Sequence, residues 1–207
     1  VGISWALLSY ELSATSLSVV FGRIGDLYGR QIVYGLGLLF LTISSFLCGV
    51  SQNIFQLILF RLLQGAAGAM TQSTGRALAM EAMPEGSAGR SQGFMSTAFA
   101  TGSFLGPSLG GLIIDYIHWR GIFFFLVPIG AVGTFLTFSY WKRWRPVGVS
   151  DSYGPKPTVD YLGAGLLMLS TVAFMATLNQ KIMEWMDPLQ RVVLLLALIG
   201  LFLGFLL

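Results

Sequence analysis

Residues 91–114 read SQGFMSTAFATGSFLGPSLGGLII, an apolar stretch with glycine at 93, 102, 106, 110 and 111 and proline at 107. A helix in water disfavours this composition, because an interior glycine costs about 1 kcal/mol and an interior proline about 3 kcal/mol relative to alanine. In a bilayer, small residues let helices approach closely, and neighbouring helices satisfy the backbone groups that a proline frees. The stretch therefore predicts a membrane-spanning helix that packs closely along Gly102, Gly106 and Gly110 and bends at Pro107.

The composition of the whole chain indicates the same class of protein. The 207 residues are 55% hydrophobic and only 10% charged, with a mean hydropathy of +0.75, whereas average soluble domains carry about 25% charged residues. Seven apolar segments each approach the ~20 residues that a helix needs to cross a bilayer. They are residues 1–21, 32–50, 54–75, 91–114, 121–141, 160–180 and 191–207. We predict an all-α integral membrane protein, a helical bundle with about seven transmembrane helices.

The basic residues predict the orientation of these helices. The connections after the first, third and fifth segments hold eight Lys and Arg, and the opposite connections hold three. Because cytoplasmic loops carry the excess of Lys and Arg, the first set is expected in the cytoplasm. That set is Arg23, Arg30, Arg76, Arg90, Lys142, Arg143, Arg145 and Lys156. The net charge of +3 follows from this bias, and no basic-aromatic patch predicts a nucleic-acid partner.

A polar stretch divides the chain. Residues 146–159 carry three prolines, at 146, 155 and 157, which predicts a cytoplasmic linker. It would separate a five-helix block, residues 1–145, from two further helices in residues 160–207. The chain opens on Val1 inside an apolar run, so we expect it to be a piece of a longer protein.

A glycine-rich, charged connection follows the first segment. Its sequence is GRIGDLYGRQ, from Gly22 to Gln31, and it contains Asp26, Gly29 and Arg30. The turn is so short that glycine is needed to make it. Asp26 is placed to accept hydrogen bonds from a helix N-terminus, and Arg23 or Arg30 to pair with it or with another carboxylate. Such a cluster can hold one conformation closed; an ordinary solvated loop is the alternative.

A second cluster lies inside the third apolar segment. Arg61 sits about 10 Å into this helix, where an arginine is costly unless it faces a cavity or a partner. Arg61, Gln64, Gly65, Gly68 and Gln72 share one helical face, which predicts a polar stripe lining a wet path. The alternative is an arginine that extends to the outer interface.

Glu11 is the one acidic residue placed well inside an apolar segment. A carboxylic acid in apolar surroundings is suited to carry a proton. Glu11 and Arg61 lie at comparable depth, so the two can pair. A structural glutamate at a helix contact is the alternative interpretation.

These features together resemble the major facilitator superfamily of secondary transporters. Gly22–Arg30 is similar to the superfamily's loop between its second and third helices, and Leu57–Gly68 to its fourth-helix motif with an intramembrane arginine. Gly93–Gly111 matches the fifth-helix motif of antiporters, and residues 118–130 (HWRGIFFFLVPIG) resemble drug:proton antiporters. On this alignment the chain begins at the second helix. Two helices after the linker resemble the fourteen-helix drug:proton antiporters, which insert two helices between their halves.

The resemblance implies proton-coupled export of small hydrophobic or cationic compounds by alternating access, from the cell membrane, by a multi-pass protein in the lipid bilayer. Its small-molecule substrate and protons would be handled by Arg61, Glu11, Gln64 and Gln72. A conformational latch would comprise Gly22, Asp26, Gly29 and Arg30. The fifth-helix antiporter motif would comprise Gly93, Gly102, Gly106, Pro107, Gly110 and Gly111. No metal or cofactor is implied, and the whole protein is expected to work as a monomer.

Two rival functions remain. One is a superfamily uniporter or symporter of a small polar nutrient or metabolite, which the fifth-helix motif disfavours. The other is an intramembrane enzyme. The single histidine, His118, falls in a predicted outer loop with no partner for a catalytic dyad, and neither HExxH nor GxxxxGK[ST] occurs. We therefore expect a transporter and not an enzyme.

Overall fold

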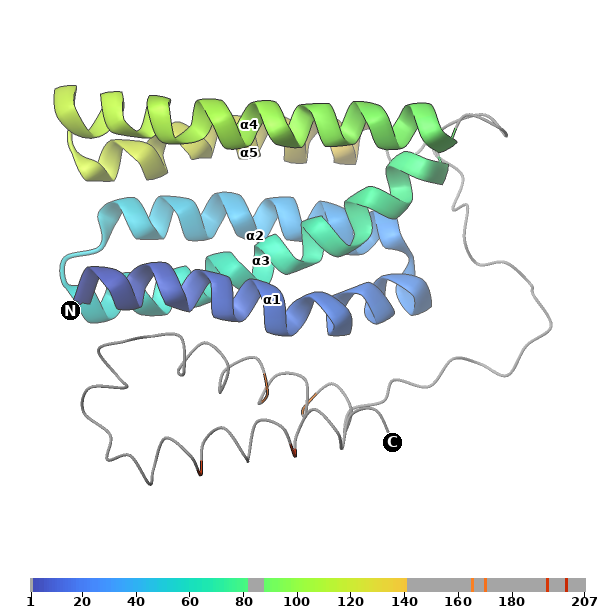
Figure 1. Ribbon diagram of the computed structural model, residues 1–207, viewed down its shortest axis with the longest axis horizontal. Coiled ribbons are helices and arrows are strands. Elements are labelled where there is room, and N and C mark those ends of the chain that lie inside the picture. Colours follow the sequence, from blue (N-terminus) through green and yellow to red (C-terminus); the bar gives the residue numbers. More distant parts are fainter. Residues whose placement is uncertain are drawn as a thin grey trace.

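The computed structural model describes residues 2–81 and 88–140, together with the single residues Gly165, Ser170, Val193 and Gly200. The described part contains five α-helices (Figure 1). They are α1 (Gly2–Tyr28), α2 (Arg30–Val50), α3 (Ile54–Glu81), α4 (Ala88–Tyr116) and α5 (Trp119–Tyr140). The predicted linker, and all but those four residues of the two predicted helices beyond it, lie outside the described residues.

The described helices have the dimensions of membrane spans. The shortest has 21 residues, which at 1.5 Å per residue spans the ~30 Å hydrocarbon core of a bilayer. Four of the five, α2 to α5, are both long and apolar enough to cross a membrane. The fifth, α1, has 27 residues and packs in the same bundle. The predicted all-α membrane bundle is confirmed for this part of the chain.

The helices alternate in direction, so the α1–α2 and α3–α4 connections lie at one end and the α2–α3 and α4–α5 connections at the other (Figure 1). We call these the first end and the second end. Helix α3 packs extensively against both α1 and α2, and α2 also packs against α5. Helix α4 makes only sparse contacts, with α5 and α3.

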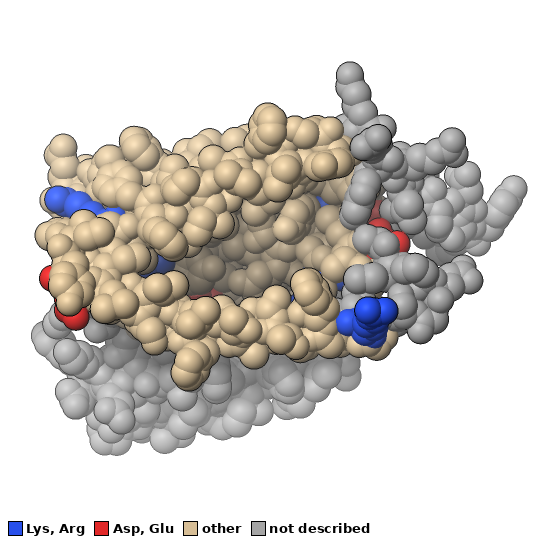
Figure 2. Space-filling model, turned by 90° about the horizontal axis from the view of Figure 1, so that it is seen from above, with Lys and Arg blue, Asp and Glu red and all other residues tan. Residues whose placement is uncertain are grey.

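The interior of the bundle is built from small residues. Many buried side chains are alanine, serine, threonine or cysteine, such as Ser45, Cys48 and Thr74, whereas large phenylalanines and leucines are exposed. A soluble protein has the reverse distribution, but lipid-facing helices need small residues between them to approach closely. Figure 2 shows a face with most of its charged residues at the two ends, uncharged ridges between them, and a few charged atoms inside a central hollow. The uncharged ridges are what a protein immersed in lipid is expected to present.

Two local predictions were wrong in their boundaries. Helix α1 continues to Tyr28 and α3 to Glu81, seven and six residues past the predicted apolar segments. Asp26 and Arg30 therefore lie on helices and not in a loop. Hydropathy marks where a helix leaves lipid, whereas the backbone hydrogen bonds and the packing of α1 on α3 continue beyond that point. Helix α4 also runs without a break through Pro107.

Candidate functional site

A single residue makes the turn between α1 and α2. Gly29 has φ of +102° and is the N-cap of α2, a conformation that side-chain-bearing residues rarely adopt. Its N–H donates to the Gly25 carbonyl at 2.9 Å, and its carbonyl accepts from Ile32 and Val33. The prediction that this turn requires glycine is confirmed.

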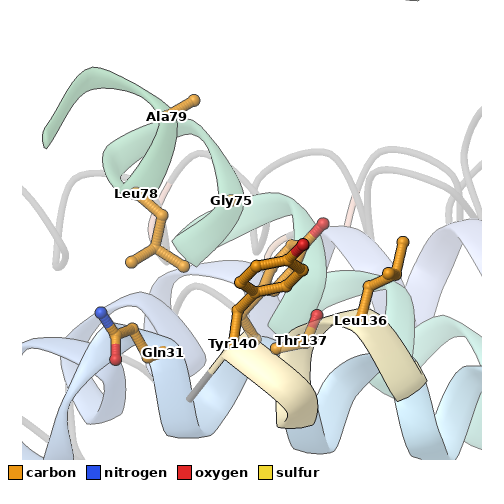
Figure 3. A pocket seen from close by; sticks show the side chains of 8 residues that line it. Gln31, Gly75, Leu78, Ala79, Leu136, Thr137 and Tyr140 are labelled. Carbon is orange, nitrogen blue, oxygen red and sulfur yellow. The ribbon is translucent and has the colours of Figure 1, made fainter. Parts of the chain in front are cut away.

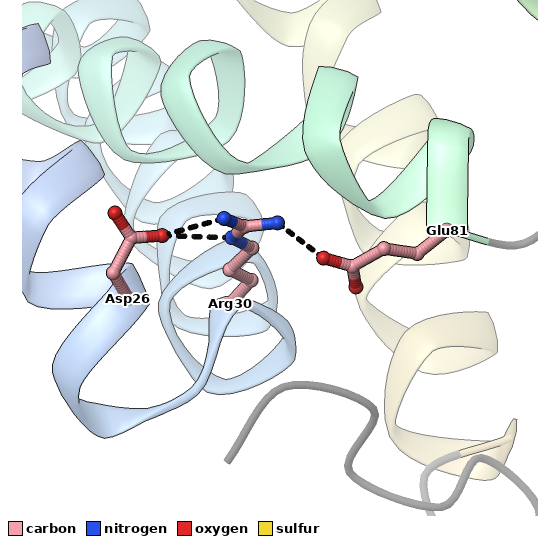
Figure 4. A network of polar contacts seen from close by, with 3 residues as sticks. All are labelled: Asp26, Arg30 and Glu81. Carbon is pink, nitrogen blue, oxygen red and sulfur yellow. Dashed lines mark hydrogen bonds and ion pairs between the residues drawn. The ribbon is translucent and has the colours of Figure 1, made fainter. Parts of the chain in front are cut away.

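Three helices meet at the first end through one arginine, as Figure 4 shows. Arg30, at the start of α2, donates from Nε to Asp26 Oδ1 on α1 at 2.8 Å and from Nη2 to the same oxygen at 2.8 Å. Arg30 Nη1 also pairs with Glu81 Oε1, at the last residue of α3. The predicted partner of Asp26 is thus Arg30, and Glu81 is the second carboxylate. We call these three residues the end triad.

The glycines beside the triad differ in how tightly they pack. A Cβ added at Gly25 would lie 2.7 Å from Cγ2 of the buried Thr74, whereas one at Gly22 would meet Ser73 Cβ at an ordinary 3.6 Å. The close approach of α1 to α3 therefore depends on Gly25. The spacing of the motif had drawn attention to Gly22 instead.

Arg61 lies inside α3 and contacts residues from two other helices. Its Nη1 donates to Gln64 Oε1 at 3.2 Å, and its guanidinium carbon lies 4.8 Å from the centroid of the Phe123 ring on α5 and 5.7 Å from that of the Tyr10 ring on α1. Gln64, buried and 2% exposed, donates through Nε2 to Ser45 Oγ on α2 at 2.8 Å. Arg61 is thus enclosed by partners and does not simply extend to the interface.

Ser45 orients the Gln64 amide. Its hydroxyl donates to the Leu41 carbonyl at 2.7 Å, so its remaining capacity is as an acceptor. An acceptor at that position requires the NH₂ of Gln64, which leaves the carbonyl oxygen of Gln64 for Arg61. No periodic pattern or motif marks Ser45 in the sequence, because its partner is 19 residues away on another helix.

The small residues of the predicted polar face pack against α1. A Cβ at Gly65 would collide with the Tyr10 carbonyl oxygen and lie 2.8 Å from Ser13 Cβ, and one at Gly68 would lie 2.9 Å from the Tyr10 hydroxyl oxygen. Ser13 Oγ also donates to the Leu62 carbonyl at 2.8 Å. Our expectation of a wet path along this whole face was wrong, because a helix contact fills it. Gln72 is the exposed member, one turn beyond.

Glu11 follows Tyr10 on α1 and is exposed among the described residues. Its charge acts on Arg61, but within residues 2–81 and 88–140 the two side chains form no ion pair. The sequence predicts a buried Glu11, but the described residues leave its side chain exposed. Its electrostatic interaction with Arg61 is therefore what supports Glu11 as a candidate site residue.

The glycine stripe of α4 is open. All of Gly93, Gly102 and Gly106 are exposed, and a Cβ added at any glycine of the stripe meets nothing within 4 Å. No helix of the described part packs along it. The close-packed partner that the sequence predicts for this stripe is therefore not among α1, α2, α3 and α5.

Two adjacent cavities run between α2 and α5. The first, about 440 Å³, reaches α3 at the first end (Figure 3), and the second, about 400 Å³, shares Tyr34, Leu136 and Thr137 with it. None of the predicted site residues lines either cavity. Ser45 does line the second, so it connects this space to Gln64 and Arg61. Within the described residues no group of three His, Cys, Asp or Glu side chains could hold a metal ion.

Comparison with known proteins agrees with this architecture. The whole chain, residues 1–207, matches the Major Facilitator Superfamily. It is 31% identical over 204 residues to multidrug resistance protein 3 of Bacillus subtilis, which covers 98% of this chain and 37% of that protein. It is 38% identical over 176 residues to an uncharacterized MFS-type transporter, Rv1877, of Mycobacterium tuberculosis, covering 84% of this chain and 24% of that protein. It is also 30% identical to the riboflavin transporter RibZ of Clostridioides difficile, covering 86% of this chain and 38% of that protein. The chain thus spans about a quarter to two fifths of the length of these relatives.

Three findings agree: a membrane helical bundle with an arginine enclosed inside α3, an end triad beside a one-residue glycine turn, and a family match over the whole chain. The chain therefore belongs to the Major Facilitator Superfamily of membrane transporters.

Proposed function

We propose that the protein of which this chain forms part is a proton-coupled antiporter that exports small hydrophobic or cationic compounds by alternating access. The observation that carries the proposal is the environment of Arg61, an arginine at membrane depth with one amide partner and two aromatic rings. A charge that is costly to bury and incompletely neutralised is characteristic of an ion pathway. Relatives named as multidrug resistance or multidrug transporter proteins support the drug-export part.

In this mechanism Arg61 sets the proton affinity of a carboxylate that approaches it, because an arginine nearby favours the ionised form of an acid. Glu11 is the candidate carboxylate, and Gln64 and Gln72 complete the polar surroundings. The end triad holds the first end closed, which on the predicted orientation is the cytoplasmic end. The glycine stripe of α4 provides a sliding contact with helices beyond the described part, and each proton entering down a 100 mV potential supplies about 2.3 kcal/mol.

The test is proton movement in everted vesicles that contain the full-length transporter. Adding a cationic dye substrate should release protons from the vesicle lumen in the wild type. Arg61→Ala should abolish this exchange, and Glu11→Gln should uncouple dye movement from proton movement. Gln92→Ala serves as a control, since Gln92 is an exposed residue near the start of α4. If Arg61→Ala and Glu11→Gln both exchange at the wild-type rate, the coupling roles are wrong.

A carrier for a polar metabolite is the second candidate. It is favoured by the relatives named as a riboflavin transporter and as a vacuolar membrane amino acid uptake transporter. Accumulation of riboflavin or an amino acid by cells expressing the full-length protein, without dye-induced proton release, would decide for it. We propose the cell membrane as the location and a monomer as the working unit. Fourteen helices are proposed for the whole protein.

A further inference from the structure

The guanidinium of Arg61 is only partly satisfied by hydrogen bonds. A guanidinium has five N–H donors, and the contact with Gln64 Oε1 at 3.2 Å uses one of them. The Nε is buried and has no hydrogen-bond partner among the described residues. No carboxylate of the described part lies within ion-pair distance of Arg61. Among the described residues, a different kind of interaction holds this charge.

Two aromatic rings supply that interaction. The Phe123 centroid lies 4.8 Å from the guanidinium carbon and the Tyr10 centroid 5.7 Å from it, both inside the ~6 Å range of a cation–π contact. Phe123 is buried, at 5% exposed, and the attraction is strongest where water is excluded. The Tyr10 hydroxyl lies beside Gly68 and hydrogen-bonds with the Gln72 side chain.

The Phe123 ring is itself held from the second end. The Trp119 ring lies edge-on to it, at 6.1 Å and 89°. The next residue, Arg120, donates from Nη2 to the Ser51 carbonyl at 2.7 Å and lies 5.1 Å over the Trp119 ring. The start of α5 is thereby tied to the end of α2, and the ring one turn further on is fixed in position.

We propose that Tyr10 and Phe123 form an aromatic clamp that positions Arg61 for proton coupling, with Phe123 as the main positioning residue. The clamp holds the cation without a counter-ion among the described residues and leaves its remaining N–H groups available to a carboxylate that arrives during the transport cycle. The functional part of this inference rests on the antiporter proposed above; the structural part does not.

The structural part is tested by the chemical reactivity of Arg61 in the purified full-length protein. Phenylglyoxal modification of Arg61 is followed by mass spectrometry. Phe123→Leu keeps apolar volume but removes the ring, and should raise the modification rate about threefold or more. Phe123→Tyr keeps a π-face and should react like the wild type. Replacement of Phe123 by 3,4,5-trifluorophenylalanine keeps the shape but weakens the electrostatic attraction, and should react like Phe123→Leu.

Phe124→Leu is the matched control. Phe124 neighbours Phe123 on α5 but packs against Phe46, with ring centroids 6.0 Å apart, and against Gly49. This variant should leave the reactivity of Arg61 unchanged. If Phe123→Leu and the trifluoro variant both react at the wild-type rate, the clamp does not exist. If Phe123→Leu reacts faster but the trifluoro variant does not, the ring acts by packing and the cation–π proposal is overturned.

Transport then tests the coupling role separately. Dye-induced proton release should fall about tenfold in Phe123→Leu and in the trifluoro variant, and recover in Phe123→Tyr. Faster Arg61 labelling with unchanged proton release would overturn the positioning role while confirming the clamp. If the wild type releases no protons with any dye, the proposed antiport is wrong, and the labelling results still decide whether the clamp exists.

Discussion

Gly25 and Gly29 show how single glycines set the geometry of the first end. Gly29 supplies a backbone conformation with positive φ, and Gly25 supplies space against Thr74. The first requirement can be anticipated from the sequence, because a turn between two helices this close needs a residue without a Cβ. The second cannot, because it depends on which residue of α3 lies opposite.

Gly25→Ala should destabilise the protein by about 1–3 kcal/mol, since its methyl group would overlap the methyl of a buried threonine that has no room to move. Gly22→Ala should change stability by less than about 0.5 kcal/mol, because its new methyl would make only an ordinary contact with Ser73. Thermal unfolding of the full-length protein in detergent measures both. Equal losses from the two variants would contradict the packing assigned to α1 and α3.

At the scale of elements, α3 and α4 show opposite outcomes for similar compositions. Both are apolar helices that carry several glycines, three residues apart at Gly65 and Gly68 of α3 and four residues apart from Gly102 to Gly110 of α4. Gly65 and Gly68 of α3 pack against α1, and Gly75 packs against Tyr34 on α2, as small-residue packing in membranes requires. The α4 glycines touch nothing in the described part. A glycine stripe of this length, against which no described helix packs, is suited to a helix contact that breaks and re-forms during transport.

Gly106→Leu should therefore abolish transport while leaving membrane insertion normal. The added side chain disturbs no described contact of the five-helix block, since nothing lies within 4 Å of its Cβ, but it would block close approach of a partner helix. Dye efflux at matched membrane expression is the measurement. Phe104→Leu, on the other side of α4 by the 100° helical step and 79% exposed, is the control. Wild-type efflux by Gly106→Leu would eliminate the stripe as a moving contact.

At the scale of the whole molecule, the end triad joins α1, α2 and α3 through partly exposed ion pairs. Such pairs contribute about 0–1 kcal/mol each, too little to hold a fold together. That magnitude is sufficient to bias two conformations of similar energy. The triad is thus suited to a latch that releases once in each cycle.

Arg30→Gln should raise the population that is open at the first end by up to about fivefold, the change that corresponds to 1 kcal/mol. A cysteine introduced at Tyr140, which lines the cavity near this end, reports opening through its rate of maleimide labelling. Arg76→Gln removes the same charge from an exposed position of α3 and should leave labelling unchanged. Equal labelling in both variants would show that net charge, and not the triad, controls this end.

Much of the architecture could be predicted from the sequence, because a membrane imposes it. Apolar length, glycine content and the position of Arg61 indicate an all-α membrane bundle, and the motifs indicate the superfamily. Local spacing predicted that Asp26 pairs with Arg23 or Arg30, and Arg30 makes this contact. These predictions succeeded because helix length, burial cost and turn geometry depend on residues close together along the chain.

The tertiary structure decided which distant residues meet. It pairs Glu81 with Arg30, and it places Ser45 against Gln64, the hydrogen-bond partner of Arg61. It also places the rings of Phe123 and Tyr10 beside the Arg61 guanidinium and leaves Glu11 exposed. It also shows that α1 packs against Gly65 and Gly68 near Arg61, whereas no described residue packs against the glycine stripe of α4. Hydrophobic periodicity in the sequence identifies which face of a helix is small or polar. It cannot specify which neighbour covers that face, because helix packing is settled by side-chain shape across contacts tens of residues apart in sequence.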